Sequence, residues 1–446
     1  MIFRLFLVGC SVVLALGHGA ASAGLQIQNW RTPQGTNVLF VETHELPLID
    51  ISIDFAAGSA YNDAPKAGLA SMTRHMLALG AGGLSDDEIA RRFEDVGAQL
   101  GGSFDADRAG LSLRTLSSAR ERDQAIDTFA LVLHRPDFAT AVLEREKARS
   151  IAALKEAMTR PAALADRAFM RALYGEHPYA LPSGGQISTI STLTTEDVTA
   201  FYRKFYSAAN ATLAIIGDLD RAAAEKLAER LSAGLPQGPA AAPLPPVKLP
   251  EQSITRRIAH PASQSHILLG QPGVKRGDPD YFALYLGNYA LGGGGFDSRL
   301  VKELRQKRGL VYSASSYFIP QREFGPFELG LQTERSQADQ ALDVARTTLA
   351  DYVRDGPSAA ELAQAKNNII GGFPLRLDSN RKILDYLAVI GFYGLPLDYL
   401  DTFTGKVAAV TAADIRAAFT RRLRLDALST VLVAVDNADP PAPAAK

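Results

Sequence analysis

GLASMTRHMLALGAGG, residues 68–83, is predicted to begin as a helix with an unusual polar face. Ser71, Arg74 and His75 stand at positions i, i+3 and i+4, so they lie on one face of a helical turn. His75 is a residue type that binds metals, whereas Arg74 is a permanent cation. This face is therefore a candidate functional site, and features elsewhere in the chain should account for its unusual combination of residues.

Strand and helix patterns surround this stretch. Residues 38–41 and 49–55 read as strands, and the alternation of the second predicts one buried and one solvent-facing side. Ser85-Asp86-Asp87-Glu88 is a capping box that begins a helix. Residues 142–158 and 195–205 carry helical periodicity, and residues 211–216 form a predicted buried strand.

The second half of the chain repeats the first. Asp197 aligns with Asp414, 217 residues later, and in both places a helix precedes an apolar strand. Residues 143–147 align with 362–366 at a shift of 219. Two matches at nearly one shift indicate duplication. The predicted fold class is α+β, with two homologous α/β domains, each a mostly antiparallel or mixed sheet with helices on one side.

Composition and length give the outline of the chain. A length of 446 residues predicts more than one domain, and a formal net charge of −1 argues against nucleic acid as a partner. Residues 234–250 (GLPQGPAAAPLPPVKLP) are rich in Pro and Ala and predict an extended linker. The predicted organisation is a signal peptide at 1–23, a first domain at 24–233, the linker at 234–250, a second domain at 251–436 and a disordered tail at 437–446.

The N-terminus has the order of an export signal. Arg4 precedes an apolar run at residues 5–16, too short for a membrane span, and Ala21-Ser22-Ala23 is a small-x-small cleavage site. Cys10, the only cysteine, ends a lipoprotein-like Leu-Val-Gly-Cys, but only about five apolar residues precede it, where a signal needs at least ~7. We favour cleavage after Ala23 over a lipid anchor. The expected location is the periplasm, where a protein of this size does not require disulfides.

With these features together, the chain resembles the pitrilysin-type (inverzincin) metallopeptidases, which include the mitochondrial processing peptidase. The resemblance rests on the duplicated halves, on residues 68–77 and on residues 292–312. It implies two α/β domains that form a clam-like half, and two such halves that close around an unfolded peptide.

Active members of that family carry His-x-x-Glu-His, whose two His bind zinc and whose Glu activates water. Mapped onto this chain, the first ligand is Ser71, the base is Arg74 and the second ligand is His75. A further zinc-binding Glu of the family falls near Ala153, and Glu146 and Glu156 lie nearby on the same predicted helix, although neither stands at the ligand position. A catalytic zinc needs three protein ligands, so the resemblance implies no zinc in this chain.

The resemblance also assigns roles in the second half. Arg305 precedes Tyr312 by seven residues, as in the family's Arg/Tyr segment, which reaches into the zinc cleft. It implies that Tyr312 donates a hydrogen bond to the oxyanion of the tetrahedral intermediate and that Arg305 binds the substrate backbone or the same charge. The glycine-rich stretch with Gly293, Gly294 and Phe296 resembles a substrate-binding loop. From the residues alone, Arg305 could cap a helix, Tyr312 could pack at a strand start, and the loop could be a plain connection.

Three functions therefore stay open. The first is a zinc-free subunit, inactive alone, that completes the site of a homologous zinc-bearing partner and so acts on unfolded peptides. The second is a non-catalytic peptide-binding or scaffold protein of the same fold. The third is an active zinc peptidase with substitute ligands.

Overall fold

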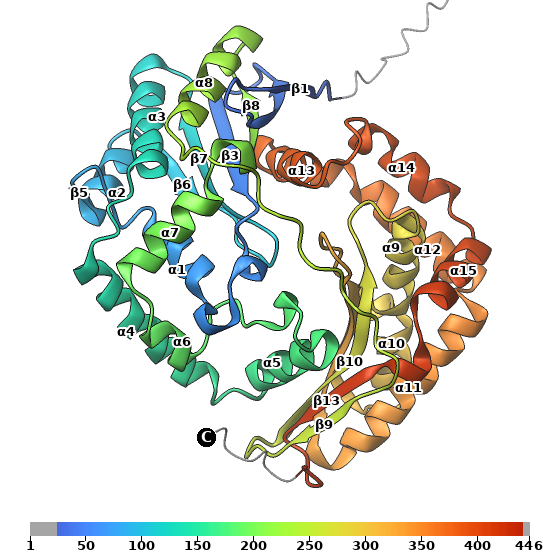
Figure 1. Cartoon of the computed structure of the whole chain (residues 1–446). Helices are drawn as coiled ribbons and strands as arrows, with labels where there is room; N and C mark the ends of the chain where they lie inside the picture. The colour runs from blue at the N-terminus through green and yellow to red at the C-terminus, as the bar shows by residue number, and fades with distance from the viewer. Residues whose placement is uncertain (1–24, 440–446) are drawn as a thin grey trace, which may run out of the picture.

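The computed structural model describes residues 25–439, so the predicted signal peptide, Cys10 and the last part of the predicted tail lie outside the described residues. Asn437 and Asp439, from the start of that tail, hydrogen-bond to Arg257. Within residues 25–439, no helix is both long and apolar enough to cross a membrane. The chain forms two halves, each built on a sheet covered by helices (Figure 1).

The first half contains sixteen principal elements. In chain order they are β1 Gln28–Arg31, β2 Asn37–Glu42, β3 Leu48–Phe55, α1 Leu69–Met76, β4 Gly80–Ala81, β5 Leu84–Ser85, α2 Asp86–Glu94, β6 Gln99–Gly101, β7 Ala109–Leu116, α3 Ala119–His134, α4 Thr140–Ala157, α5 Pro161–Tyr174, α6 Ile187–Ser191, α7 Thr195–Phe205, β8 Ala211–Gly217 and α8 Arg221–Ala233. Residues 234–250 then run without helix or strand.

The second half contains twelve principal elements. They are β9 Thr255–Ile258, β10 Gln264–Val274, α9 Tyr281–Asn288, α10 Arg299–Val301, β11 Val311–Phe318, β12 Gly325–Glu334, α11 Ala338–Asp355, α12 Ala359–Gly372, α13 Asn380–Tyr393, α14 Tyr399–Ala409, α15 Ala412–Arg422 and β13 Ser429–Val433. Short 3₁₀ and π turns connect several of them.

Apart from the additional edge strand β1 of the first half, both sheets have the same strand order. The first runs β1-β2-β8-β3-β7-β6, and the second, from its opposite edge, runs β9-β13-β10-β12-β11. The late strand of each half, β8 or β13, sits between earlier strands and pairs parallel to one of them, while all other pairs in both sheets are antiparallel. The α7 and α15 helices that precede these strands each begin with a Thr-x-x-Asp capping box. The mixed sheets and the duplication are thus confirmed.

Two helices cross between the halves. Helix α5 of the first half packs on β10 and β13, and α13 of the second half packs on β8 and β3 (Figure 1). Each half thereby covers the sheet face that the other half's own helices leave free. The two helices start at Pro161 and Asn380, 219 residues apart, so they are equivalent parts of the duplication.

The crossing corrects one expectation about β3. The polar residues Asp50, Ser52 and Asp54 were predicted to face water, but all three are buried. Helix α13 covers this face, and Arg114 forms a two-point ion pair with Asp50 at 2.7 and 3.0 Å. Asp54 accepts a hydrogen bond from Ser103, although its burial raises its pKa. An alternation of apolar and polar residues therefore predicts a solvent-facing side of a strand only where no element distant in sequence packs against that side.

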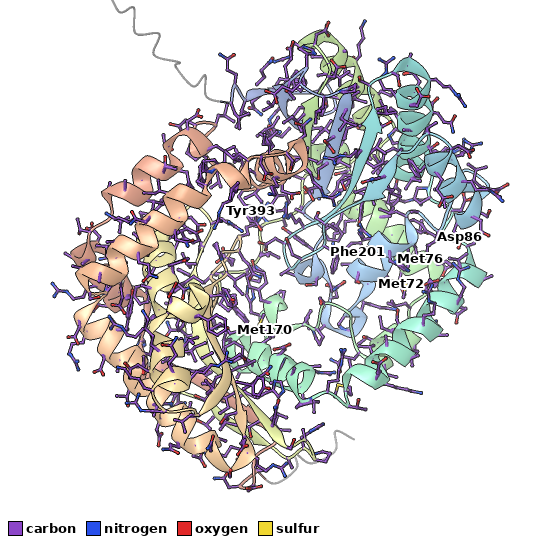
Figure 2. All side chains as sticks on the ribbon, turned by 180° about the vertical axis from the view of Figure 1, so that it is seen from behind. Met72, Met76, Asp86, Met170, Phe201 and Tyr393 are labelled. Carbon is purple, nitrogen blue, oxygen red and sulfur yellow. The ribbon has the colours of Figure 1, made fainter. Side chains whose placement is uncertain are left out.

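A buried carboxylate joins the halves. Asp107, from the loop before β7, is fully buried and accepts hydrogen bonds from Tyr179 Oη at 2.6 Å and Tyr393 Oη at 2.9 Å. The backbone N–H of Arg322 donates to it at 2.7 Å. Tyr393 ends α13 and lies between the halves (Figure 2). One carboxylate therefore ties a loop of the first half to two segments of the second.

Candidate functional site

Helix α1 carries a polar face formed by Ser71, Arg74 and His75. Gly68 precedes the helix with a left-handed φ of 94°, and the helix ends at Met76, so residues 77–83 leave it. On the opposite face, Met72 and Met76 lie together with Phe201 of α7 inside the first half (Figure 2). This packing leaves Ser71, Arg74 and His75 on the less buried side.

Arg74 is engaged by the protein backbone. Its Nε donates to the carbonyl oxygen of Gly110 at 3.2 Å, and its Nη2 donates to that of Gly101 at 3.3 Å. Burial lowers the pKa of Arg74, but a guanidinium remains charged at any physiological pH. A fixed cation at the position of the family's catalytic base cannot accept a proton from water and repels a metal ion.

His75 is paired with Glu146 of α4. Its Nε2 lies 3.0 Å from Glu146 Oε2, and its side chain is 51% exposed, so it is not a core residue. Burial alone favours neutral Glu146, but hydrogen bonds from Arg145 and His75 outweigh it and lower the pKa of this carboxyl. Ala153, at the position predicted for a distal ligand, is exposed on the same helix and has no donor atom.

The first half therefore does not fit a catalytic zinc. Of its motif positions, one is an arginine bonded to carbonyls, one an alanine, one a serine and only His75 a metal ligand. Within residues 25–439, no group of three or more His, Cys, Asp and Glu side chains is placed to hold a metal ion.

We expect a purified chain dialysed against micromolar zinc to retain far less than one equivalent, measured by inductively coupled plasma mass spectrometry. Stoichiometric zinc retention that is lost in His75→Ala would contradict this description of the site.

In the second half, Arg305 lies on an irregular helical segment. It belongs to a π-helical turn, Lys302–Gln306, that packs against β11. The nearby acid, Glu303, pairs with Lys307 and Arg308 at 2.6 and 2.7 Å, so Arg305 has no carboxylate partner among residues 25–439. Its guanidinium lies instead 5.1 Å from the ring centre of Phe296. The charge is thus available to a ligand.

Tyr312 is set apart by a β-bulge. The pairing of β11 with β12 skips from Val311 to Ser313, so Tyr312 is the additional residue of the strand. Its side chain is 73% exposed. Bulges re-aim single side chains and are common beside active sites. The structure therefore presents the Tyr312 hydroxyl to solvent instead of burying it at a strand start.

The glycine-rich loop is fastened to β11. A π-helical turn, Tyr289–Gly293, follows α9, and Asn288 and Ser316 exchange hydrogen bonds at 2.6 and 2.7 Å. A Cβ at Gly292 would lie 2.5 Å from the Ser316 nitrogen, so only glycine fits there. Gly293 and Gly294 continue the turn and lead to Phe296, which is 68% exposed. Gly292 thus packs closely against β11, and the loop ends in an exposed aromatic side chain.

Gly292→Ala should disturb this fastening. The added methyl overpacks the contact with β11, and we expect the free energy of unfolding to fall by about 1–3 kcal/mol. Chemical denaturation measures the change. Gly371→Ala is the matched control: Gly371 lies in α12 with open space at its Cβ, so the same change should stabilise by up to about 1 kcal/mol. If Gly292→Ala left the free energy of unfolding unchanged, the loop would be able to shift away from β11 and accommodate the added methyl group, contrary to this expectation.

The structure brings some predicted residues together and keeps others apart. Arg305 and Phe296 are in contact, and the segments of Arg305 and Gly292 both pack on β11, the strand that carries Tyr312. Among residues 25–439, no hydrogen bond or ion pair links them to Arg74 or His75. The Asn288–Ser316 exchange was not anticipated from the sequence, although a polar Asn288 within an apolar helical stretch four residues before the glycine run was a signal that could have suggested it.

Comparisons with known proteins agree with this geometry. A family model described as insulinase (peptidase family M16) matches residues 37–185, and one described as the peptidase M16 inactive domain matches residues 192–369. A crystal structure of a peptidase M16 inactive domain from Pseudomonas fluorescens is 39% identical, with a TM-score of 0.89, and the match covers 94% of this chain and 100% of that one. The chain belongs to peptidase family M16.

Two curated relatives are more distant. A non-peptidase homolog, YmxG, from Helicobacter pylori is 24% identical over 90% of this chain and 92% of that protein. An uncharacterized zinc protease from Streptomyces coelicolor is 29% identical over 56% of this chain and 55% of that protein. The family and fold predicted from the duplicated halves and from residues 68–77 and 292–312 are therefore confirmed.

Proposed function

We propose that this chain is the zinc-free subunit of a heterodimeric peptidase and that it supplies Arg305 and Tyr312 to the active site of a homologous zinc-bearing partner. The observation that carries the proposal is an asymmetry. The first half keeps only His75 of the family's metal ligands and has an arginine in place of the base, whereas the second half holds a guanidinium without a carboxylate partner and an exposed phenol at a β-bulge.

The chemistry of the two side chains supports this role. A phenol O–H and a guanidinium are donors that stabilise a developing oxyanion without exchanging a proton at neutral pH. The base and the zinc would come from the partner. Tyr312 would donate to the oxyanion, and Arg305 would bind the same charge or the substrate carbonyls. In this arrangement neither chain is complete alone.

The substrate would be an unfolded peptide. Phe296 offers an exposed aromatic contact, and the turn at Gly293 and Gly294 has little side-chain bulk, so an extended main chain could approach it. The proposed location is the periplasm, which rests on the export signal read from residues 1–23.

Co-purification from the native organism tests the pairing. We expect a tagged chain to retain, after gentle lysis, a homologous chain with an intact His-x-x-Glu-His in equal amount, identified by mass spectrometry. Recovery of the tagged chain alone, at native expression levels and with crosslinking, would argue against a heterodimer.

A second candidate is a non-catalytic peptide-binding or scaffold protein. It is favoured by one observation: the Helicobacter pylori relative is named a non-peptidase homolog. Under this alternative, peptide binding would persist without a zinc-bearing partner, and Tyr312→Phe would not affect any peptidase.

A further inference from the structure

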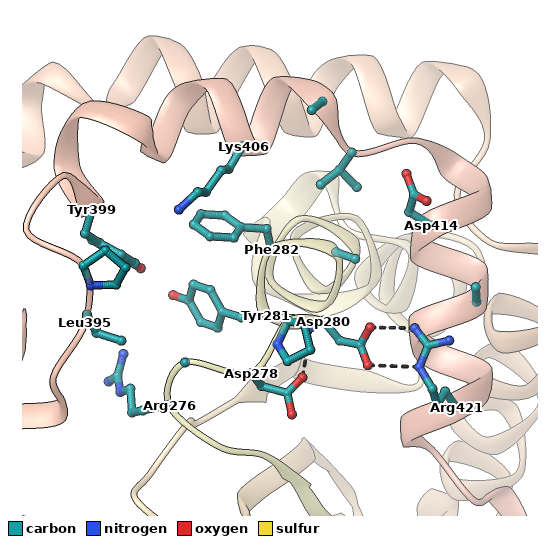
Figure 3. Close-up of a pocket in the computed structure, with 17 residues that line it drawn as sticks. Arg276, Asp278, Asp280, Tyr281, Phe282, Leu395, Tyr399, Lys406, Asp414 and Arg421 are labelled. Carbon is teal, nitrogen blue, oxygen red and sulfur yellow. Dashed lines mark hydrogen bonds and ion pairs between the residues drawn. The ribbon is translucent and has the colours of Figure 1, made fainter.

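A pocket of about 730 Å³ lies in the second half, away from Arg305 and Tyr312 (Figure 3). It is enclosed by the start of α9, by the loop into α14 with α14 itself, and by α15. None of the residues in the candidate site lines it. Its volume is within the range of about 300–1,000 Å³ that is usual for small-molecule sites.

The acidic residues of the pocket are already hydrogen-bonded within the protein, and two of them pair with arginines. Asp280 accepts from Arg421 at 2.6 and 3.1 Å and from Arg422 at 2.7 Å, and these bonds lower its pKa. Asp278 pairs with Arg422 at 2.7 Å. Asp414 accepts two hydrogen bonds from the residue that caps α15. The carboxylates of the pocket are therefore already hydrogen-bonded to other groups of the protein.

Two cations in the pocket have no such partner. Arg276 and Lys406 form no ion pair within residues 25–439, and the Nε of Arg276 is buried without a hydrogen-bond acceptor there. Aromatic rings lie near both charges: Tyr393 lies 5.2 Å from the Arg276 guanidinium, and Phe282 lies 5.6 Å from Nζ of Lys406, which is exposed at the pocket rim. A buried donor without an acceptor is costly, so a bound anion would be stabilised here.

The space between these cations is walled by rings and aliphatic groups. Tyr281, Phe282 and Tyr399 project into it, with Leu395 near Arg276 (Figure 3). The ring centres of Phe282 and Tyr399 are 6.1 Å apart. Such an apolar lining favours a ligand with an apolar group. An inorganic anion would contact the cations but leave most of the apolar lining without a partner.

We propose that this pocket binds a small organic carboxylate with an aromatic or branched apolar body. Its carboxylate would lie between Arg276 and Lys406, and its body would contact Phe282, Tyr281 and Tyr399. This site is independent of the proposed peptidase role, because it uses no residue of the Arg305 segment.

Isothermal titration of the chain with N-acetyl-L-phenylalanine tests the proposal. We expect one saturable site, at least about tenfold weaker binding of the corresponding amide, which lacks the charge, and a similar loss for N-acetylglycine, which lacks the ring. Lys406→Gln and Arg276→Gln should each weaken binding by about tenfold, and Lys406→Arg should restore most of it. Lys226→Gln, at an exposed cation on α8, is the matched control and should bind normally.

Equal affinity for the acid and the amide, or no binding at millimolar concentration, would overturn the proposal. So would inorganic phosphate that competes as well as the aromatic acid, because the site would then be a simple anion site. Circular dichroism and thermal melting of each variant establish that a loss of binding does not come from unfolding.

Discussion

Tyr312→Phe should lower the turnover number of the reconstituted heterodimer by about 10²–10³-fold, the effect of removing one oxyanion donor. The ring stays in place, so peptide binding and assembly should remain nearly normal and the loss should fall mainly on kcat. Steady-state hydrolysis of a fluorogenic peptide, at saturating partner, measures both constants. The bulge that exposes Tyr312 is the structural reason for this expectation.

Tyr317→Phe is the matched control for this experiment. Tyr317 is on the same strand and 51% exposed, but it lies within the regular pairing of β11 with β12. Its hydroxyl should be dispensable. Equal activity of Tyr312→Phe and Tyr317→Phe would contradict the assigned role of Tyr312, even if the heterodimer itself forms.

Asp107→Ala should be the most destabilising single change in the chain's interior outside the hydrophobic core. It leaves the hydroxyls of Tyr179 and Tyr393 and the N–H of Arg322 without their acceptor. Hydrogen bonds to a charged group contribute about 1.5–3 kcal/mol each, so we expect a loss of about 3 kcal/mol or more. Denaturant titration measures it, and hydrogen exchange should show early opening of α13, whose last residue is Tyr393.

Tyr393→Phe distinguishes the loss of a hydrogen bond to Asp107 from a general disruption of packing. It removes one of the three hydrogen bonds and keeps the ring packing, so the expected loss is about 1–2 kcal/mol. A change below about 0.5 kcal/mol for Asp107→Ala, the usual range of surface substitutions, would mean that the halves are held together by apolar packing alone.

The elements that could be predicted were those with local signals. Helix α7 begins at Thr195, as its capping residues indicate, and β8 follows from an apolar run closed by Gly217-Asp218. Helices α5 and α13 were not anticipated. Pro161 at the first position of α5, and Gly394 after α13 in a left-handed conformation, were signals for their ends that could have located them.

The candidate site was predictable in identity but not in geometry. Arg305, Tyr312 and the glycines were found through a family resemblance. The π turns, the bulge and the Asn288–Ser316 exchange depend on how β11 meets the loop after α9, which no periodicity in either segment reports. The pairing of His75 with Glu146 was not anticipated either, because it arises from the packing of α4 beside α1.

The most direct test of the central claim is reconstitution of peptidase activity from separate chains. We expect that this chain alone, and a homologous chain with an intact zinc motif alone, hydrolyse an unstructured peptide only at background rates. Mixing them should restore hydrolysis, with saturation at equimolar amounts. A zinc-bearing homologue that is fully active alone and unchanged by this chain, or hydrolysis by this chain alone, would contradict the account.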